Sequence, residues 1–325
     1  MRYRVGVIGC TGVGTRHASG LVGLENVELV AGCDLSSAVL ERFQDRWREN
    51  WPDLITYTSH CEMLEKESLD LVTIATSDHK HADLVVDAAE AGVKGIFCEK
   101  PMATSIADAD RMLAATDANG TILSVDHTRR WQPLWVRTKQ LVTGGAIGNL
   151  QNIVGTLNGG RAMLFRNGTH LIDAICYFAD STPGWVFAEL EDGYEDYTEY
   201  RGDGGHDPKT EPSAHGYIHF ENGVRAFYVG GSKKTSAGFS LEVVGTKGRI
   251  RISDSRAVLD KGEQTSAIEA PTWEITGIPA GVRELVRLVQ EGGAPVSSGH
   301  EAYKVIKITI GFLQSQQRGN IRINF

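Results

Sequence analysis

Hydrophobic and polar positions divide the chain into two regions with different patterns. In the first 125 residues, short apolar runs alternate with segments in which apolar positions recur at helical spacing. This alternation is typical of parallel strands joined by crossover helices. The strands are predicted at residues 3–8, 27–33, 69–75, 93–98 and 121–125. Their nearly continuous hydrophobicity predicts a parallel sheet that is buried on both faces.

The pattern changes near residue 126, where longer alternating runs and turn signals replace the crossover helices. Hairpins are predicted within residues 217–229, around an Asn-Gly pair, and within residues 239–252. We therefore predict an α/β chain of two domains. Residues 1–125 carry the parallel sheet, and residues 126–325 form an α+β domain with a largely antiparallel open sheet.

An antiparallel sheet of this kind has one packed face and one free face. A free face is a common subunit interface, so we expect a homodimer or homotetramer. Residues 191–212 are rich in acidic residues, Gly and Tyr and have no clear period, which predicts a loop. Two interpretations of this loop stay open, a lid over the substrate and a solvated insertion.

Composition narrows the class of protein. The chain has 325 residues, is 41% hydrophobic and carries a net charge of −8 without a basic stripe, which argues against nucleic-acid or anionic-membrane binding. The five cysteines lack CxxC spacing, so no metal site is predicted. The sequence has no signal-peptide pattern and no apolar run near the ~18 residues of a membrane helix. We expect a cytoplasmic protein with a small-molecule substrate.

The hexapeptide GCTGVG at residues 9–14 follows the first predicted strand and opens a helix. It resembles the dinucleotide fingerprint G-x-G-x-x-G with Thr11 at the middle glycine. Gly9 is expected to allow the tight turn, and Gly14 the close packing of helix on strand. Thr11 either tolerates the close approach of a pyrophosphate or donates its hydroxyl to a phosphate, and Gly12 supplies flexibility. With Val13, these residues form the predicted phosphate-binding loop.

Asp34 points to the identity of the dinucleotide. It ends the second predicted strand twenty residues after Gly14, where a carboxylate accepts the ribose 2′-hydroxyl and repels a 2′-phosphate. This position favours NAD over NADP. In the alternative interpretation, Asp34 is the N-cap of the next helix. Arg42 and Arg46 on that helix keep NADP as a second candidate cofactor.

Lys100 is the candidate catalytic lysine. It lies in the tripeptide EKP at residues 99–101, just after the strand predicted at 93–98, where an open parallel sheet places its ligand. A partly desolvated lysine beside a cationic nicotinamide would have a lowered pKa, which suits proton transfer. The alternative is a solvated surface charge.

Other strand ends complete the predicted cofactor contacts. Ala75 ends the third predicted strand and Thr76 follows it, and Glu99 and Lys100 follow the fourth predicted strand. His81, close behind Thr76, is assigned to the cofactor pocket, with a surface or capping role as its alternative; the same alternatives apply to His79.

Several phrases together resemble the glucose-fructose oxidoreductase and inositol dehydrogenase family, Gfo/Idh/MocA. The matching phrases are VGVIGCTGVGTRHA from Val5, VAGCD ending at Asp34, VTIATSDHKHADLVVDAAEAGVKGIFCEKPMA from Val72, GTHLID from Gly168, LEVVGTKGRIRI from Leu241 and SGHEAYKVIKI from Ser298. They span nearly the whole chain. The combination of glycine loop, EKP and GTHxxD is much more specific than any one of these motifs.

The resemblance implies an N-terminal Rossmann domain, a C-terminal domain on a largely antiparallel sheet, and a substrate site between them. It implies that Lys100 and His170 are catalytic and flank the reacting hydroxyl. One takes the hydroxyl proton while hydride leaves the same carbon for the nicotinamide. The implied enzyme is an NAD(P)-dependent oxidoreductase acting on a secondary alcohol or ketone of a sugar, cyclitol or related polyol.

The sequence departs from the family at one motif position. The family motif commonly reads D-x-G-x-H-x-x-D, and its first Asp is Arg166 here, whereas His170 and Asp173 are retained. The two retained residues are predicted on one face of a helix that begins near Thr169. Arg166 either clamps an anionic substrate in a bidentate contact or points into solvent.

Arg129 lies at the predicted domain junction and is followed by Arg130 and Trp131. Two roles stay open for it, a substrate contact and a structural hinge. The predicted substrate contacts are Lys100, Arg129, Arg166, His170 and Asp173.

Two other functions stay open. A catalytically silent NAD(P)-binding regulator is suggested by Arg166, although retention of Lys100 and His170 speaks against it. A redox-neutral glycoside-cleaving enzyme with tightly held NAD is the other, and it would turn over without added nucleotide.

Overall fold

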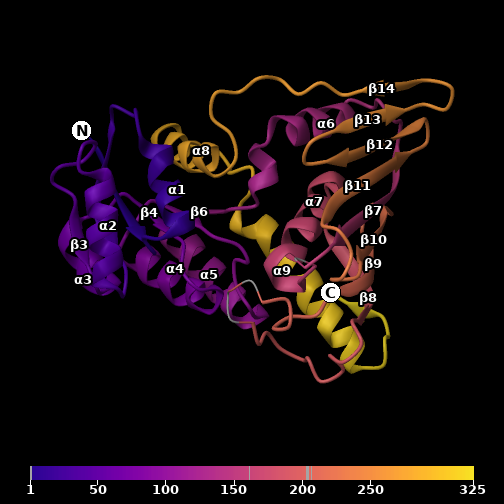
Figure 1. Cartoon of the computed structure of the whole chain (residues 1–325), viewed down its shortest axis with the longest axis horizontal. Helices are drawn as coiled ribbons and strands as arrows, with labels where there is room; N and C mark the ends of the chain where they lie inside the picture. Colours follow the sequence, from indigo (N-terminus) through magenta and orange to yellow (C-terminus); the bar gives the residue numbers. More distant parts are fainter. Residues whose placement is uncertain (1, 161, 203–204, 206) are drawn as a thin grey trace. The chain divides into compact units, whose positions relative to one another are not determined.

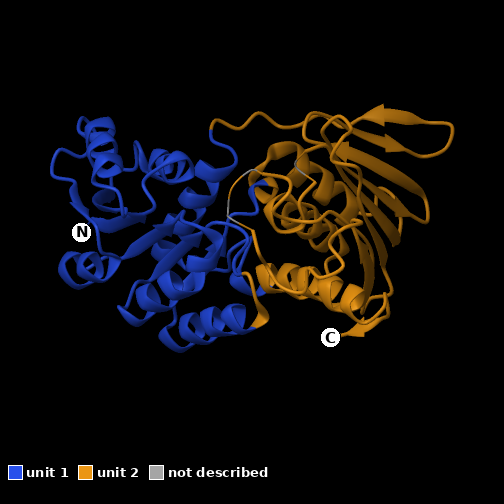
Figure 2. Cartoon of the chain, turned by 60° about the horizontal axis from the view of Figure 1, so that its bottom comes forward, with its two compact units in different colours: residues 1–103, 107–128, 275–300 blue, residues 104–106, 129–274, 301–325 orange. Residues whose placement is uncertain are grey.

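The computed structural model describes residues 2–160, 162–202, 205 and 207–325, and it consists of two compact units (Figure 2). Unit 1 comprises residues 1–103, 107–128 and 275–300, and unit 2 comprises residues 104–106, 129–274 and 301–325. The sequence pattern predicts a second domain that contains everything after residue 125. The structure instead places residues 126–128 and 275–300 with unit 1.

Unit 1 is built on a six-stranded parallel sheet in the order β3-β2-β1-β4-β5-β6. Its strands are β1 (Tyr3–Ile8), β2 (Val27–Cys33), β3 (Ile55–Tyr57), β4 (Leu71–Ile74), β5 (Gly95–Cys98) and β6 (Ile122–Val125). Its helices are α1 (Gly12–Leu21), α2 (Ser37–Trp47), α3 (His60–Glu67), α4 (His81–Glu90), α5 (Ile106–Asn119) and α8 (Ile278–Glu291), with a short turn at Asp78–Lys80. Every residue of β4 and β5 is buried, as predicted for a sheet covered on both faces.

The order of the strands creates a switch point between β1 and β4. From β1 the chain proceeds outward to β2 and β3, and then returns to β4 and proceeds the other way to β5 and β6. At such a point the loops after the two central strands diverge, and open α/β sheets bind their ligands there. The loop that follows β1 contains the predicted dinucleotide fingerprint.

Helix α8 belongs to unit 1 because its apolar face packs against α1, β5 and β6. Two small residues permit the contact. A Cβ at Gly20 would lie 3.0 Å from Cβ of Val282, and a Cβ at Gly95 would lie 2.7 Å from Cγ2 of Val289. The guanidinium of Arg283 also donates to the carbonyl oxygens of Gly20 and Val22 at 2.9 and 2.6 Å, which satisfies groups at the end of α1.

Unit 2 is built on a nine-stranded sheet in the order β14-β13-β12-β11-β7-β10-β9-β8-β15. Its strands are β7 (Leu150–Asn158), β8 (Pro183–Leu190), β9 (Ala214–Phe220), β10 (Arg225–Gly230), β11 (Gly238–Gly245), β12 (Gly248–Ser253), β13 (Ala257–Asp260), β14 (Thr265–Ala267) and β15 (Ile323–Asn324). Its helices are α6 (Pro133–Thr143), α7 (Thr169–Ala179) and α9 (Gly299–Gln317), with short turns at Thr128–Trp131 and Leu164–Gly168. No helix in the described part of the chain is long and apolar enough to cross a bilayer.

The sheet of unit 2 is mixed but mostly antiparallel, as expected. Only β7 and β10 pair in parallel among the described strands of this sheet. Both predicted hairpins are confirmed, the first as β9 with β10 and the second as β11 with β12. The turn residues in the sequence therefore correctly predicted both of these hairpins.

The two faces of this sheet differ in chemistry. Along β8, Val186 and Ala188 are buried, whereas Phe187 between them is 43% exposed. Helix α7 covers the buried face and contacts β7, β10 and β11 (Figure 1). The alternation confirms the prediction of one packed face and one free face.

Residues 191–212 are a loop, as predicted, but they are not simply a solvated insertion. Among the described residues 191–202, 205 and 207–212 there is no helix or strand. Tyr197 is 3% exposed and Glu211 is 1% exposed. The loop is thus packed onto unit 2 at both positions. Residues 203, 204 and 206 lie outside the described residues.

Candidate active site

The glycine loop has the geometry that its sequence predicted. Gly9 has a φ of +87°, and a Cβ there would lie 2.2 Å from the carbonyl oxygen of Ala75. A Cβ at Gly14 would lie 1.7 Å from the carbonyl oxygen of Gly9. Backbone occupies the space of a side chain at both positions, so neither glycine can be replaced without moving the loop.

Thr11 and Gly12 form the start of α1. Thr11 is exposed, and its side chain makes no capping hydrogen bond to α1 in the described structure. Gly12 has a φ of +36°, and no described atom lies within 4 Å of the place where a Cβ would be. The first amides of a helix lack intrahelical acceptors, so this exposed turn, which continues with Val13, offers donors to an anion.

Asp34 joins the end of β2 to the glycine loop. Its Oδ2 accepts from the amide of Cys10 and its Oδ1 from the amide of Ser36, both at 3.0 Å. The alternative that Asp34 is the N-cap of α2 is wrong, because that position is Ser36. Each carboxylate oxygen has a second lone pair. Asp34 can therefore hold the loop and still accept a ribose hydroxyl.

His81 ties together the segments that follow β4 and β5. The side chain is fully buried, with Nδ1 2.8 Å from the carbonyl oxygen of Pro101 and Nε2 3.3 Å from that of Thr76. Burial lowers the pKa of His81 more than the two carbonyls raise it. A neutral ring has one N–H, and the shorter contact favours Nδ1 as the donor. His81 is thus engaged by the backbone, whereas His79 is exposed.

The remaining strand ends lie along the same edge of the sheet. Ala75 and Thr76 follow β4, and Glu99 and Lys100 follow β5, the next strand in the sheet. Lys100 is half-buried, and the peptide bond between it and Pro101 is cis. Because β1, β4 and β5 are adjacent and parallel, their carboxyl ends bring the glycine loop, residues 75–76 and Lys100 to one edge.

Glu99 belongs to a buried polar group at this edge, whose other members, His17 and Asp126, were not predicted from the sequence. Nε2 of His17 is 3.3 Å from Oε1 of Glu99, and His17, Glu99 and Asp126 have ligand atoms within 4.8 Å of one another. Burial lowers the pKa of His17 to about 4. Burial and the neighbouring Glu99 raise the pKa of Asp126 well above its usual range. At neutral pH, His17 is therefore uncharged, and the raised pKa of Asp126 favours its protonated form beside Glu99.

Two signals in the sequence could have revealed this group. Asp126 directly follows β6, and thus satisfies the same strand-end rule that selected Glu99 and Lys100. His17 lies on the buried face of α1, three residues after Gly14 and four before Leu21. A polar residue on the core-facing stripe of a helix is a signal for a buried polar partner.

In unit 2, the predicted helix with His170 and Asp173 is confirmed as α7, which begins at Thr169. His170 is half-buried. Asp173 forms an ion pair with Arg130 at 2.8 Å, with side chains that are 2% and 3% exposed. Burial disfavours the charge of Arg130, but Asp173 and, at 3.3 Å, Glu301 together outweigh this effect, and the pKa of Arg130 is raised. The structure thus assigns Asp173 a contact within unit 2, and its predicted contact with substrate stays a prediction.

Arg129 is also engaged within unit 2. Its guanidinium donates to both carboxylate oxygens of Asp254, at 2.9 and 2.8 Å, and lies 3.3 Å from the ring centroid of Phe239. A contact between Arg129 and substrate would have to share this guanidinium, so that role also stays a prediction. The neighbouring Trp131 is buried.

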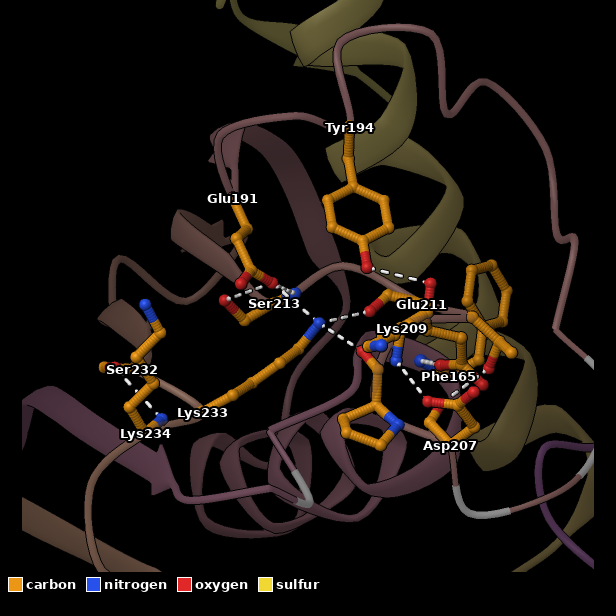
Figure 3. Close-up of polar contacts among 12 residues, drawn as sticks. Phe165, Glu191, Tyr194, Asp207, Lys209, Glu211, Ser213, Ser232, Lys233 and Lys234 are labelled. Atoms are coloured by element: carbon orange, nitrogen blue, oxygen red, sulfur yellow. Dashed lines mark hydrogen bonds and ion pairs between the residues drawn. The ribbon is translucent and has the colours of Figure 1, made fainter.

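Arg166 lies in the π-helical turn Leu164–Gly168, which leads directly into α7. Its side chain is half-buried. The amides of Phe165 and Arg166 both donate to Oε2 of Glu211, at 2.7 and 3.0 Å (Figure 3). Glu211 could not be predicted from the sequence, because a carboxylate in an aperiodic acidic loop carries no pattern that distinguishes it from its neighbours.

Comparison with curated proteins gives partial matches to sugar and cyclitol dehydrogenases. The chain is 34% identical over 148 residues to myo-inositol 2-dehydrogenase of Thermotoga maritima, a match that covers 45% of this chain and 42% of that protein. It is 36% identical over 147 residues to D-apiose dehydrogenase of Paraburkholderia graminis, covering 45% and 38% respectively. The chain thus matches less than half the length of these relatives.

Comparison with solved structures extends the fold over the whole chain. An oxidoreductase from Agrobacterium radiobacter, in complex with NAD⁺, L-tartaric acid and magnesium, superposes with a TM-score of 0.83 at 17% identity and covers 100% of this chain and 98% of its own. Aldose-aldose oxidoreductase from Caulobacter crescentus, complexed with glycerol, gives a TM-score of 0.83 at 18% identity, with 100% of both chains covered.

Family models match both units. Residues 3–127 match the model of the oxidoreductase family with an NAD-binding Rossmann fold, and residues 135–251 match the GFO/IDH/MocA C-terminal domain. The resemblance inferred from the motifs is confirmed. The chain belongs to the Gfo/Idh/MocA oxidoreductase family.

Proposed function

We propose that the protein is an NAD-dependent oxidoreductase that transfers hydride between the nicotinamide and a secondary alcohol or ketone of a sugar, cyclitol or related polyol. The observation that carries this proposal is the edge of unit 1 at which the ends of β1, β4 and β5 bring together the glycine loop, residues 75–76 and Lys100. Membership of the family and the named activities of the relatives support it.

The residues present fit a dinucleotide. Gly9 and Gly14 leave backbone where side chains would otherwise stand, and the start of α1 offers unsatisfied amides to a pyrophosphate. Asp34 is available to the ribose and repels a 2′-phosphate, which supports NAD over NADP. When bound, the nicotinamide supplies the hydride chemistry.

The side chains of the protein would transfer the proton of the reacting hydroxyl. We assign to Lys100 the exchange of a proton with the reacting hydroxyl, since it is half-buried at the end of β5. His170 is proposed as the second catalytic residue, on the strength of the matched GTHxxD motif. Arg166, at the position where the family commonly has Asp, is proposed to recognise an acidic substituent of the substrate.

The experiment is a screen of sugars, inositols and sugar acids with NAD and NADP, followed at 340 nm, with wild type and Lys100→Met. The variant should lose at least a hundredfold in kcat and leave NADH binding largely intact. Lys94→Met is the matched control, since Lys94 precedes β5 at the opposite edge of the sheet and pairs with Asp70 on the surface. Equal turnover of Lys100→Met and Lys94→Met would overturn the assignment.

The screen also separates the two alternatives. A silent regulator would bind nucleotide and reduce no NAD across the panel. A redox-neutral glycosidase would copurify with nucleotide and release a sugar without added NAD.

We also propose that the protein is a homo-oligomer joined through the free face of the unit 2 sheet. Phe187 and Phe227 on this face are each 43% exposed. The ring of Tyr217 lies between them, with centroids 5.4 Å from each. Exposed aromatic residues that are contiguous on one surface are typical of an interface.

A further inference from the structure

Glu211 is a buried carboxylate with two backbone partners in the turn before α7. It is 1% exposed, and one of its oxygens, Oε2, accepts from the amides of Phe165 and Arg166. The amide of Leu164 donates to the carbonyl oxygen of Pro212 at 2.9 Å. Three successive amides of the turn are thus satisfied by two consecutive residues of a segment more than 40 positions away in the sequence.

These contacts replace a local cap. The π-helical turn Leu164–Gly168 runs directly into α7, and neither Met163 before the turn nor Gly168 before α7 makes a side-chain capping bond in the described structure. The first amides of a helical segment need acceptors, and a carboxylate there gains from charge-assisted hydrogen bonds and from the helix dipole. Glu211 supplies that carboxylate.

Lys233 fixes the segment that carries Glu211 (Figure 3). Its Nζ donates to the carbonyl oxygens of Pro208 and Glu211, both at 2.6 Å, and pairs with Oε2 of Glu191 at 2.7 Å. That oxygen of Glu191 also accepts from the amide of Ser213 at 3.1 Å. One lysine therefore joins both ends of the 191–212 loop, and the backbone of residue 211 has little freedom to shift.

Tyr228 limits the turn further. A Cβ at Gly168 would lie 2.5 Å from the hydroxyl oxygen of Tyr228, which is fully buried on β10. Burial, and next the negative charge of Glu211, raise the pKa of Tyr228, so this phenol stays neutral. The turn is packed against β10 without room for a side chain at Gly168.

We propose that Glu211 is a positioning residue for the reaction proposed above. Its carboxylate holds the turn that bears Arg166 and thereby sets the register in which α7 presents His170, two residues after the turn. The expected effect on kcat rests on the proposed function. The expected effect on the turn rests on the hydrogen bonds of Glu211 alone. Misplacement of a reacting group by about 1 Å can cost on the order of a hundredfold in rate.

Three variants test it. Glu211→Met removes both acceptor oxygens and keeps the chain length, whereas Glu211→Gln keeps one neutral acceptor. Glu199→Gln is the control, since Glu199 is an exposed carboxylate of the same loop. Hydrogen exchange of a peptide covering residues 162–173 reports the turn, titration with NADH reports the nucleotide site, and steady-state kinetics are scaled to the folded fraction.

We expect Glu211→Met to exchange at least tenfold faster in this peptide and to lose at least tenfold in kcat, with NADH affinity within twofold of wild type. Glu211→Gln should recover part of both losses, and Glu199→Gln should equal wild type. Unchanged exchange in Glu211→Met would overturn the structural part. Faster exchange with full kcat per folded molecule would overturn the positioning role. If wild type turns over no substrate, the proposed function fails, and the exchange data still decide whether Glu211 holds the turn.

Discussion

Asp173 and Arg130 form an ion pair at 2.8 Å, with side chains that are 2% and 3% exposed. Loss of one partner of a buried pair that has no other partner costs about 3–5 kcal/mol. Arg130 also contacts Oε2 of Glu301 at 3.3 Å, so part of its charge stays compensated when Asp173 is neutralised. We expect Asp173→Asn to lower the free energy of unfolding by less than about 3–5 kcal/mol, measured by urea denaturation. The double variant Arg130→Met/Asp173→Leu should be more stable than Asp173→Asn. Normal stability together with lost substrate binding would instead support the role of Asp173 as a substrate contact.

Asp34 should control both loop geometry and nucleotide choice. Asp34→Asn removes the charge that holds the amide of Cys10 and repels a 2′-phosphate. We expect NADH to bind about tenfold more weakly, or about 1.4 kcal/mol, with a smaller loss or a gain for NADPH. Fluorescence titration measures both affinities. Asp53→Asn, at an exposed position of unit 1, is the control. Parallel losses for both nucleotides would restrict Asp34 to a structural role in the loop.

The lowered pKa of His17 predicts that the free energy of unfolding decreases at acidic pH. Its pKa is about 4 in the folded protein and 6.5 in the unfolded chain, so the unfolded state binds more protons between these values. Stability is therefore fully present above pH 6.5 and is lost as the pH falls towards 4, by about 3 kcal/mol for this group. Denaturation curves of wild type and His17→Gln should differ in slope across this window, whereas exposed His79→Gln should follow wild type. Parallel curves for His17→Gln and wild type would contradict this assignment.

The free face of the unit 2 sheet predicts the oligomeric state. Phe187→Ser/Phe227→Ser removes two exposed rings from this face. We expect light scattering after size exclusion to give a homo-oligomer for wild type and a smaller species for the variant. Trp273→Ser, at a residue outside this face that is 39% exposed, is the matched control. A wild-type monomer of about 35 kDa would contradict the proposal.

Local patterns predicted most of the fold. The glycine loop, the fully buried parallel strands and the Asn-Gly hairpin depend on short-range chemistry, since each is decided by residues that are neighbours in sequence. The assignment of α8 could not be predicted this way. The gaps at Gly20 and Gly95 and the hydrogen bonds of Arg283 to the end of α1 bind this helix to unit 1, and these contacts join residues far apart in the sequence.

The candidate site likewise has features that local sequence patterns predict and features that depend on tertiary packing. Strand ends correctly placed Thr76 and Lys100 on one sheet edge, because parallel strands share a direction. The partners of Asp173 and Arg129 were not predictable, because Arg130 and Asp254 reach them through tertiary packing. The role of Glu211 was still harder to predict. It depends on hydrogen bonds from two backbone amides, and no pattern of side chains in the sequence indicates them.

Helix α8 makes unit 1 discontinuous in the chain, and this affects how the protein can be synthesised and divided. A fragment that stops at residue 128 would leave the face of α1 around Gly20 uncovered and its last carbonyls without Arg283. During translation the nucleotide-binding half cannot finish folding until the ribosome has delivered nearly the whole polypeptide. A stable minimal version would need α8 fused back through a designed linker.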